Sequence, residues 1–305
     1  MYAGRTVLVT GAAGFLGSHL VERLVSLGAR VVAVDSAPMP PDWASGPAND
    51  GSVRYERADV EDVSRLETLV RDERPDVVFH LAAIASPRAC AKDFATAFRV
   101  NVGGTQRVLE ASRAVGHFVL LSSAAVYGAP VVLPMAEDHP LLGRDPYAIT
   151  KIMAELLVEN AVVNDGRRAS IVRNFNAFGP RQPTEYVIPS VIRQALTTGR
   201  IELWSGAPVR DLMFVDNTEE AILAIGARSD GGTFNVGSGR GMRMADLAQR
   251  IAATVGRDVP IADLGKPVTG SPALVADVRR LRALGWEETV PFDEGLARTV
   301  AWYRR

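Results

Sequence analysis

The sequence has little of what would mark several classes of protein. Its 305 residues include one cysteine, Cys90, so an internal disulfide is excluded. We expect this thiol to be a small buried hydrophobe at ease in a reducing compartment. No apolar run reaches the ~20 residues that a membrane-spanning helix needs. The histidines show no metal-ligand spacing, so we predict no metal site and no catalytic histidine; they are His19, His80, His117 and His139.

Charge of one sign is also lacking, because 34 basic residues stand against 35 acidic ones and the formal net charge is -1. Nothing in this balance favours a nucleic acid or an anionic membrane as partner. A β-branched run begins at Thr6 and leaves no room for a signal peptide, so we expect a cytoplasmic protein. With 47% apolar residues, the chain suits one large α/β domain or a core with a smaller lobe.

The first half alternates short apolar runs with helical patterns, as in a parallel sheet built from βαβ units. We predict strands at Thr6–Val9, Arg30–Val34, Val53–Arg57, Val77–Leu81, Phe118–Ser122 and Ser170–Arg173. We predict helices near 16–27, 62–72, 93–115 and 146–163. Most of these strands are apolar throughout, which is typical of strands covered on both faces.

The pattern changes in two places. Residues 38–50 are rich in Pro, Gly, Ala and Asn, and we expect a surface loop there. From Gly179 onward several prolines interrupt the chain, and we predict a helix near 188–199 and a strand at Ile201–Trp204. We therefore expect a core at 1–175, with returns near 212–237 and a strand at Thr233–Val236, and a smaller lobe mostly within 176–305.

A glycine-rich turn follows the first predicted strand, with Gly11, Gly14 and Gly17 spaced G-x-x-G-x-x-G before a helix. Glycines let the backbone turn tightly and approach a pyrophosphate, whose charge is favoured at a helix N-terminus. A plain tight strand-to-helix turn would show the same glycines. The context of strand, turn and helix favours a dinucleotide site.

Two carboxylates follow the next strands. Asp35 ends the second strand, where it can accept hydrogen bonds from ribose hydroxyls and repel a 2′-phosphate. No arginine follows it directly, so NAD is favoured over NADP, although Asp35 could also simply brace a turn. Asp59, before Val60, could meet an adenine amino group at the end of the third strand.

Tyr147 and Lys151 form a Tyr-x-x-x-Lys pattern, which puts both side chains on one helix face. The ammonium can favour the phenolate, so that the tyrosine exchanges a proton nearer to neutral pH. An ordinary amphipathic helix could also carry this pattern. Behind a dinucleotide loop, an acid/base pair is the stronger hypothesis.

With these residues in hand, the chain resembles the extended short-chain dehydrogenase/reductases, and among them the nucleotide-sugar epimerase/dehydratase family. The resemblance covers nearly the whole length. Its motifs are Thr10–Gly17, Asp59-Val60, His80–Ala83, Asn101–Thr105, Ser122–Gly128, Tyr147 with Lys151, Arg173–Pro180, Arg210-Asp211, Val215-Asp216 and Phe234–Gly237. It implies a Rossmann-type doubly wound parallel sheet with a smaller C-terminal lobe that binds a nucleoside-diphosphate sugar.

The resemblance also implies roles for single residues. Tyr147 would be the acid/base, Lys151 its partner, and Ser123 a donor to the reacting sugar hydroxyl. The NAD contacts implied are Gly11, Gly14, Phe15, Leu16, Gly17, Asp35, Asp59, Val60, Leu81, Ala82, Ala83, Asn101, Ser122, Tyr147, Lys151 and Asn174.

The implied substrate contacts are Arg88, Ser123, Asn176, Val187 and Arg210. An arginine fork suits a diphosphate, although Arg210 could instead pair with Asp211 or Asp216, and Asn176 could brace a turn. Arg88 stands where relatives that handle glucuronate carry an arginine; a surface arginine is the alternative.

The chain departs from the family pattern in ways that bear on the reaction. Ala124 and Ala125 replace the Asp-Glu pair with which the 4,6-dehydratases perform elimination. Phe178 stands where tyrosine is usual, and Asn174 where an aromatic residue often adjoins the nicotinamide. An arginine expected before the last strand is missing, with Lys266 as a candidate substitute, so the nucleotide end could be held differently.

We therefore expect an NAD-dependent 4-epimerase of UDP-hexoses or UDP-hexuronic acids that acts through a transient 4-keto sugar. The rivals are an NAD(P)H-dependent 4-keto-sugar reductase or dehydrogenase and a catalytically silent NAD-binding regulator. The resemblance implies a homodimer joined through the helices near 93–115 and 146–163. The stripe of Ala154, Leu157, Val158 and Ala161 permits this, but it would equally suit burial in the chain's own core.

Overall fold

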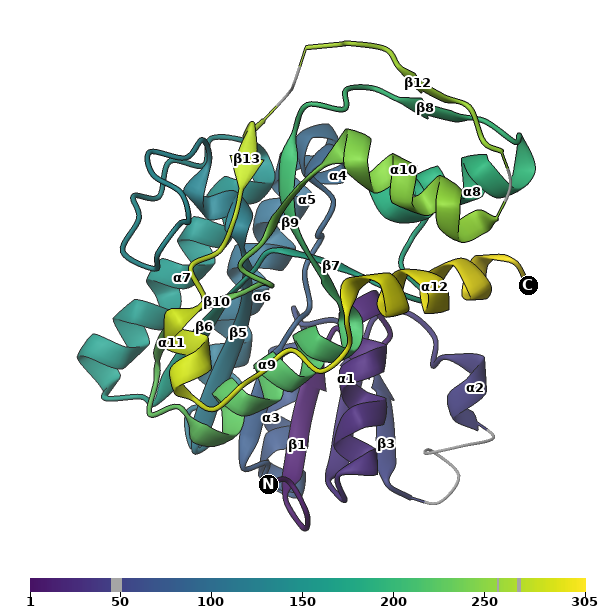
Figure 1. Ribbon diagram of the computed structural model, residues 1–305. Helices are drawn as coiled ribbons and strands as arrows, with labels where there is room; N and C mark the ends of the chain where they lie inside the picture. Colours follow the sequence, from purple (N-terminus) through teal and green to yellow (C-terminus); the bar gives the residue numbers. More distant parts are fainter. Residues whose placement is uncertain (45–50, 257, 268–269) are drawn as a thin grey trace.

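A seven-stranded sheet with all strands parallel forms the centre of the computed structural model, which describes residues 1–44, 51–256, 258–267 and 270–305. Its strand order is β10-β6-β5-β4-β1-β2-β3. The bounds are β1 Thr6–Thr10, β2 Arg30–Asp35, β3 Val53–Arg57, β4 Val77–His80, β5 His117–Ser123, β6 Ala169–Asn174 and β10 Gly232–Val236. The predicted strands match within a residue or two, and the predicted Rossmann-type fold class is confirmed (Figure 1).

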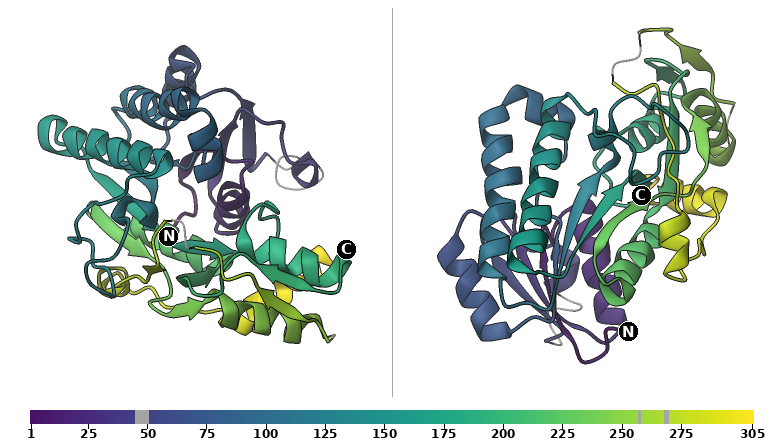
Figure 2. Two further views of the ribbon diagram at one scale, coloured as in Figure 1. Left: turned by 90° about the horizontal axis from the view of Figure 1, so that it is seen from above. Right: turned by 90° about the vertical axis from the view of Figure 1, so that its left-hand side faces the viewer.

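Alternate residues of each strand enter different cores, because side chains alternate across a pleated strand. Val7 and Val9 pack with α1 (Phe15–Ser26) and α9 (Val215–Arg228). Leu8 packs on the opposite face with α3 (Val63–Glu73), α6 (Gly104–Ala111) and α7 (Pro146–Asp165). The sheet is therefore covered on both faces, which explains its continuous apolar strands (Figure 2).

The helix predicted near 93–115 is present as a continuous helical run over 94–111, but its hydrogen-bonding pattern changes in the middle. It comprises α5 (Phe94–Phe98), a π-helical turn at Arg99–Gly103 and α6, and it follows a separate α4 (Pro87–Lys92). Ser86 and Asp93 each cap a helix by accepting a backbone N–H, from Ala89 at 3.2 Å and Thr96 at 3.0 Å. The cap at Asp93 agrees with the predicted start, whereas the cap at Ser86 starts α4, a helix that the sequence did not predict.

The predicted loop at 38–50 is partly wrong. Pro41–Ala44 form a short helix, α2, and residues 45–50 lie outside the described residues. The indole of Trp43 is fully buried and its Nε1 donates to Glu22 at 3.1 Å. Burial of this large side chain holds the segment against α1.

The later part of the chain builds a second core of its own. This core draws on α8 (Val187–Thr197), β8 (Ile201–Leu203), α10 (Met244–Val255) and α12 (Phe292–Tyr303), and β12 (Ile261–Asp263) pairs with β8. A small sheet lies between the two cores: β9 (Val209–Phe214) pairs with β7 (Asn176–Phe178), β11 (Gly241–Arg243) and β13 (Ala273–Leu274). A short helix, α11 (Arg279–Ala283), follows. The division of the chain into two domains stays a prediction.

Three further expectations concern packing. Cys90 is fully buried, as predicted, and its thiol donates to the Ile84 carbonyl oxygen at 3.3 Å. Ala154, Val158 and Ala161 are buried in the chain's own core, so this stripe is not free to join two subunits. Within the described residues, no helix has the length and apolar character to cross a membrane.

Candidate active site

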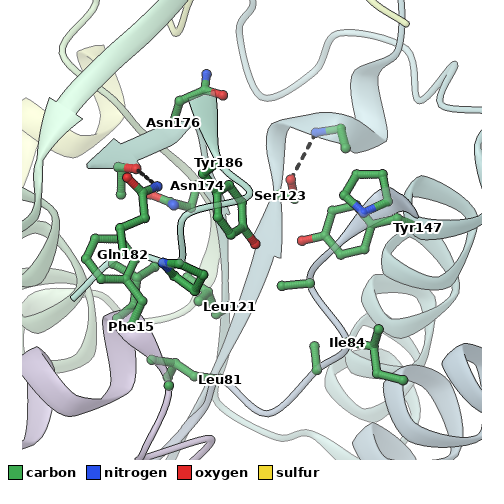
Figure 3. Close-up of a pocket in the computed structure, with 18 of the residues that line it drawn as sticks. Phe15, Leu81, Ile84, Leu121, Ser123, Tyr147, Asn174, Asn176, Gln182 and Tyr186 are labelled. Carbon is green, nitrogen blue, oxygen red and sulfur yellow. Dashed lines mark hydrogen bonds between the residues drawn. The ribbon is translucent and has the colours of Figure 1, made fainter. Parts of the chain in front are cut away.

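A cavity of about 990 Å³ lies at the carboxyl ends of the parallel strands. One wall comes from the segments that follow β1 to β6, and the opposite wall from α8, β8, β9 and α10. Open parallel sheets bind their ligands at this edge. Figure 3 shows residues from both walls, with Phe15 and Leu81 at the base of the view and Tyr147 across from Gln182.

The glycine turn fits a cofactor that must approach the backbone. Gly11 has φ +70°, and a Cβ there would lie 2.6 Å from the Ala82 nitrogen. A Cβ on Gly17 would collide with the carbonyl oxygen of Gly11. Only glycine satisfies both positions, so α1 can start at Phe15 in the cavity wall and present its first N–H groups to an anion.

Asp35 braces this turn with both carboxylate oxygens. Oδ2 accepts from the Ala13 nitrogen and Oδ1 from the Ala37 nitrogen, both at 2.9 Å. A carboxylate has about four acceptor positions, so it can brace the turn and still accept from ribose hydroxyls. Asp59 and Val60 also line the cavity, and they lie in the turn after β3, which ends at Arg57.

Most of the predicted cofactor contacts line this cavity, and the residues present fit an NAD-type dinucleotide. They are Gly11, Gly14, Phe15, Leu16, Gly17, Asp35, Asp59, Val60, Leu81, Ala82, Ala83, Ser122, Tyr147, Lys151 and Asn174. The hydroxyl of Ser122 is engaged elsewhere, since it donates to the fully buried Glu155.

Asn101 is the exception among these predictions. It is 1% exposed and is not among the residues that line the cavity. Its amide accepts from the Ile84 nitrogen at 2.7 Å and donates to the Ile84 oxygen at 3.1 Å and to Thr150 Oγ1 at 3.0 Å. The prediction is corrected: with its amide engaged in this way, Asn101 positions the cavity-lining segment at Ile84.

Tyr147 and Lys151 enter the cavity from the first turns of α7. Pro146 occupies the first turn of this helix, and the Asp145 side chain caps it by accepting from the Ala148 nitrogen at 3.0 Å. This cap fixes the start of the helix one residue before Tyr147. Both side chains are buried, with 9% of Tyr147 and 5% of Lys151 exposed.

Burial controls the protonation of this pair. It lowers the pKa of Lys151 to about 8, and the Glu155 carboxylate acts in the opposite direction. Burial also raises the pKa of Tyr147, and a hydrogen bond with Ser123 opposes that rise. In the protein alone, burial thus outweighs any stabilisation of the phenolate by Lys151, contrary to the direction expected from the pattern.

Ser123 ends β5 and is followed by a 3₁₀ turn at Ala124–Tyr127. Its Oγ accepts from the Ala125 nitrogen at 3.2 Å, which orients the hydroxyl at the cavity wall. Ala124 and Ala125 line the cavity beside it. Neither methyl group can exchange a proton.

The predicted substrate contacts have different outcomes. Asn176, Val187, Ser123 and Arg210 line the cavity, whereas Arg88 does not. Arg88 is exposed on α4, so the structure does not bring it to the site. Lys266 is likewise exposed and outside the lining, but its backbone nitrogen donates to the carbonyl oxygen of Trp204, a lining residue, at 2.9 Å, so its role as a substitute for the missing arginine stays a prediction.

Arg210 does not pair with the two carboxylates proposed as alternatives. It donates to the Val209 and Ser271 carbonyl oxygens, each at 2.9 Å. Asp211 accepts backbone N–H groups from Ser238 at 2.7 Å and Gly239 at 2.9 Å, and Asp216 pairs with another arginine. Arg210 thus reaches the cavity with its charge unpaired by either carboxylate.

Asn176 has both properties considered from the sequence. Its amide donates to the Asp211 carbonyl oxygen at 3.1 Å, which braces β7 against β9, and the residue lines the cavity. Three other lining residues, Gln182, Tyr186 and Trp204, were missed by sequence reasoning. Trp204 offered one signal, an aromatic residue at the end of a short strand, and it is 61% exposed.

Comparisons with known proteins agree with this geometry. The model of the NAD dependent epimerase/dehydratase family matches residues 7–237. The chain is 34% identical to UDP-glucose 4-epimerase of Mycolicibacterium smegmatis, over 97% of this chain and 98% of that one. It is also 32% identical to dTDP-glucose 4,6-dehydratase of Streptomyces griseus, over 98% of this chain and 94% of the relative.

A solved structure is similar over the same extent. UDP-glucose 4-epimerase of Thermotoga maritima, solved with UDP-glucose, superposes with a TM-score of 0.91 at 29% identity, and 98% of each chain is covered. Fold, cofactor cradle and sequence therefore lead to one assignment, and the predicted resemblance is confirmed: the chain is an enzyme of the NAD dependent epimerase/dehydratase family.

Proposed function

We propose that this enzyme inverts C4 of a UDP-hexose through a transient 4-keto sugar, with NAD as its cofactor. One observation carries the proposal: Ser123, Tyr147 and Lys151 lie in the same cavity as the dinucleotide cradle. Relatives named UDP-glucose 4-epimerase support it. The bound cofactor supplies reversible hydride acceptance, and Asp35 favours NAD because it would repel a 2′-phosphate.

The protein's own part is the movement of a proton. In its deprotonated form, Tyr147 takes the proton of the sugar 4-hydroxyl and becomes a phenol, and it later returns that proton to the sugar oxygen. Ser123 donates a hydrogen bond to the same sugar oxygen and steadies the charge that develops there. Lys151 holds an ammonium within the same helical turn, so the phenolate forms beside a positive group.

Elimination is disfavoured in this site. A 4,6-dehydration needs an acid and a base near C5 and C6 of the sugar. Ala124 and Ala125 occupy the wall beside Ser123 and supply neither. We therefore favour epimerisation over the dehydratase activity for which another relative is named.

The opposite wall suits the nucleotide end of the substrate. Arg210 offers guanidinium donors to a diphosphate. Asn176 adds a polar group to this wall, and Trp204 presents an exposed indole on which a uracil ring could stack.

The charged residues of the cavity favour one class of sugar substrate over another. Among the described residues that line it, Lys151 and Arg210 are the cations. The diphosphates of cofactor and substrate already supply negative charge, so a hexuronate carboxylate would enter without a counter-ion. With Arg88 outside the cavity, we favour an uncharged hexose over the hexuronic acids that the sequence left open.

We also propose a cytoplasmic homodimer. The buried thiol of Cys90 needs no oxidising compartment, and the stripe on α7 is used internally. The exposed side chains of Phe94 (42%), Phe98 (40%) and Leu156 (55%) offer an apolar contact beside it.

A panel of nucleotide sugars tests the function. Purified enzyme is incubated with UDP-glucose, UDP-galactose and UDP-glucuronate, and C4 inversion is followed by NMR while NADH absorbance is recorded. We expect inversion of the hexoses without net NADH change. Net consumption of NADH without inversion would establish a reductase instead, and no conversion of any sugar would favour a silent NAD-binding protein.

A further inference from the structure

A second cluster of ligating side chains lies outside the cavity, between α1, α9 and the segment after β7. His19, Asp216 and Glu219 each place one nitrogen or oxygen atom within 4.8 Å of the others. None of the three is among the cavity-lining residues. Asp216 and Glu219 lie one turn apart on α9, but His19 is distant from both in the sequence, so spacing alone could not indicate the cluster.

Glu219 is the residue in this cluster that lacks a donor. Its side chain is 7% exposed, and Oε1 has no hydrogen-bond partner among the described residues. The nearest polar atom of the cluster is His19 Nδ1, at 3.3 Å. A buried carboxylate oxygen without a donor is costly, so its presence points to a positive group at this position.

The tautomer of His19 strengthens this argument. Its Nε2 lies 3.0 Å from the Pro180 carbonyl oxygen, which can only accept, so we assign the ring hydrogen to Nε2. Arg181 Nε points to the same nitrogen at the longer distance of 3.3 Å, while its two terminal nitrogens bind Glu22. In this tautomer, which follows the shorter of the two contacts, Nδ1 presents a lone pair to Glu219 and two acceptors face each other.

The geometry fits a shared cation. Two ligands of a tetrahedral ion with bonds of about 2.0–2.1 Å lie roughly 3.3 Å apart, which is the separation found between Nδ1 and Oε1. Metal-bound histidines commonly donate their other N–H to a backbone carbonyl. Asp216 Oδ2 is engaged with Arg298 at 3.0 Å, which leaves Oδ1 for the cluster.

We propose that His19, Glu219 and Asp216 bind one divalent transition-metal cation of the Zn²⁺ type, with water completing its coordination. An imidazole with two carboxylates suits Zn²⁺ or Co²⁺ better than Mg²⁺ or Ca²⁺, which prefer oxygen alone. The cation would be structural: it joins α1, whose first turn lines the cofactor cradle, to α9.

The test uses the untagged, full-length enzyme with NAD bound, because an affinity tag would itself bind metal. The protein is dialysed against excess Co²⁺ or Zn²⁺, desalted and analysed for metal content, visible absorption of Co²⁺ and melting temperature. We expect one cation per chain, tetrahedral Co²⁺ absorption bands and a higher melting temperature.

Glu219→Gln should weaken binding at least tenfold, and Asp216→Asn should weaken it in the same direction. The matched control is Glu220→Gln, the same change one residue later, at a side chain that pairs with Arg23. This control should bind the cation like the unchanged enzyme. Asp216→Asn and the control keep the test decisive if Glu219→Gln fails to fold.

Two results would overturn the proposal. One is a metal content no higher than that of a protein without the cluster, measured for the unchanged enzyme. The other is equal Co²⁺ affinity in Glu219→Gln, Asp216→Asn and Glu220→Gln. Either result would mean that a proton, shared between Glu219 and His19, supplies the missing positive charge.

Discussion

Lys151 Nζ donates a hydrogen bond to the carbonyl oxygen of Leu121 at 2.8 Å, which joins α7 to the end of β5. This partner is neutral, and within the described part of the chain no carboxylate forms an ion pair with Lys151 that would offset the loss of its hydration. The hydrogen bond holds the Lys151 ammonium in place, and burial lowers the pKa of this group.

This arrangement predicts a pH dependence of stability. The pKa of Lys151 falls from 10.5 to about 8 on folding. Between these values the unfolded chain binds more protons, so the contribution of Lys151 to stability improves as pH rises from about 8 to 10.5 and is least favourable below pH 8. The change in unfolding free energy caused by Lys151→Met should therefore be more favourable at pH 7 than at pH 10.

The size of this change follows from the pKa difference. We subtract the unfolding free energy of the unchanged enzyme from that of Lys151→Met. This difference should fall by about 2 kcal/mol from pH 7 to pH 10. Urea unfolding of both proteins at the two pH values measures it. An unchanged difference would show that Lys151 does not titrate in this range. The variant should also lose epimerase activity at both pH values.

Removal of the phenol hydroxyl tests the proposed acid/base. Tyr147→Phe should lower kcat by roughly 10²–10⁴-fold, the usual contribution of a positioned proton carrier. Ser123→Ala should cost less, because a hydrogen-bond donor is lost while proton exchange survives. Both variants should retain NAD, measured after denaturation of the purified protein. Normal turnover by Tyr147→Phe on a sugar that the enzyme epimerises would refute the assignment.

Two glycines of the cofactor turn should differ in their tolerance of alanine. Gly17→Ala places a methyl group against the Gly11 carbonyl, whereas a Cβ on Gly14 lies 3.2 Å from the same atom. We expect Gly17→Ala to lose NAD binding almost completely and Gly14→Ala to weaken it severalfold. Fluorescence titration with NAD and a melting curve for each variant measure the difference. Equal NAD affinity in the two variants would contradict the close packing.

Product analysis tests the significance of Ala124 and Ala125. With UDP-glucose or dTDP-glucose, the enzyme should form no 4-keto-6-deoxy sugar, since no side chain at these positions can remove the C5 proton. NMR of the reaction mixture detects that product directly. Its accumulation would place the enzyme with the dehydratases despite the two alanines.

The sequence predicted the central sheet well because its strands are continuous apolar runs between recognisable turns. It failed where tertiary contacts decide. Asn101 matches a family motif, yet its amide is consumed by Ile84 and Thr150. Arg88 stands at a suggestive position, but it projects from a helix that ends up at the surface.

Local signals were also present that periodicity obscured. Ser86 caps α4 just before the predicted helix, and this cap, followed by Pro87 in the first turn, is visible in the sequence. Trp204 and Gln182 could not be assigned to the cavity, because their positions depend on how the second core packs against the first. Such packing follows from long-range contacts that no local pattern encodes.

The chain passes back and forth between the two hydrophobic cores several times. Phe178 belongs to the second core, Phe234 to the first, Met244 to the second, Trp286 to the first and Leu296 to the second. Because the chain crosses between the two cores several times, the second core cannot open by a hinge motion about a single linker. Ligand entry should therefore depend on local rearrangement of segments at the cavity mouth, and the radius of gyration in solution should change little when NAD and a UDP-sugar bind.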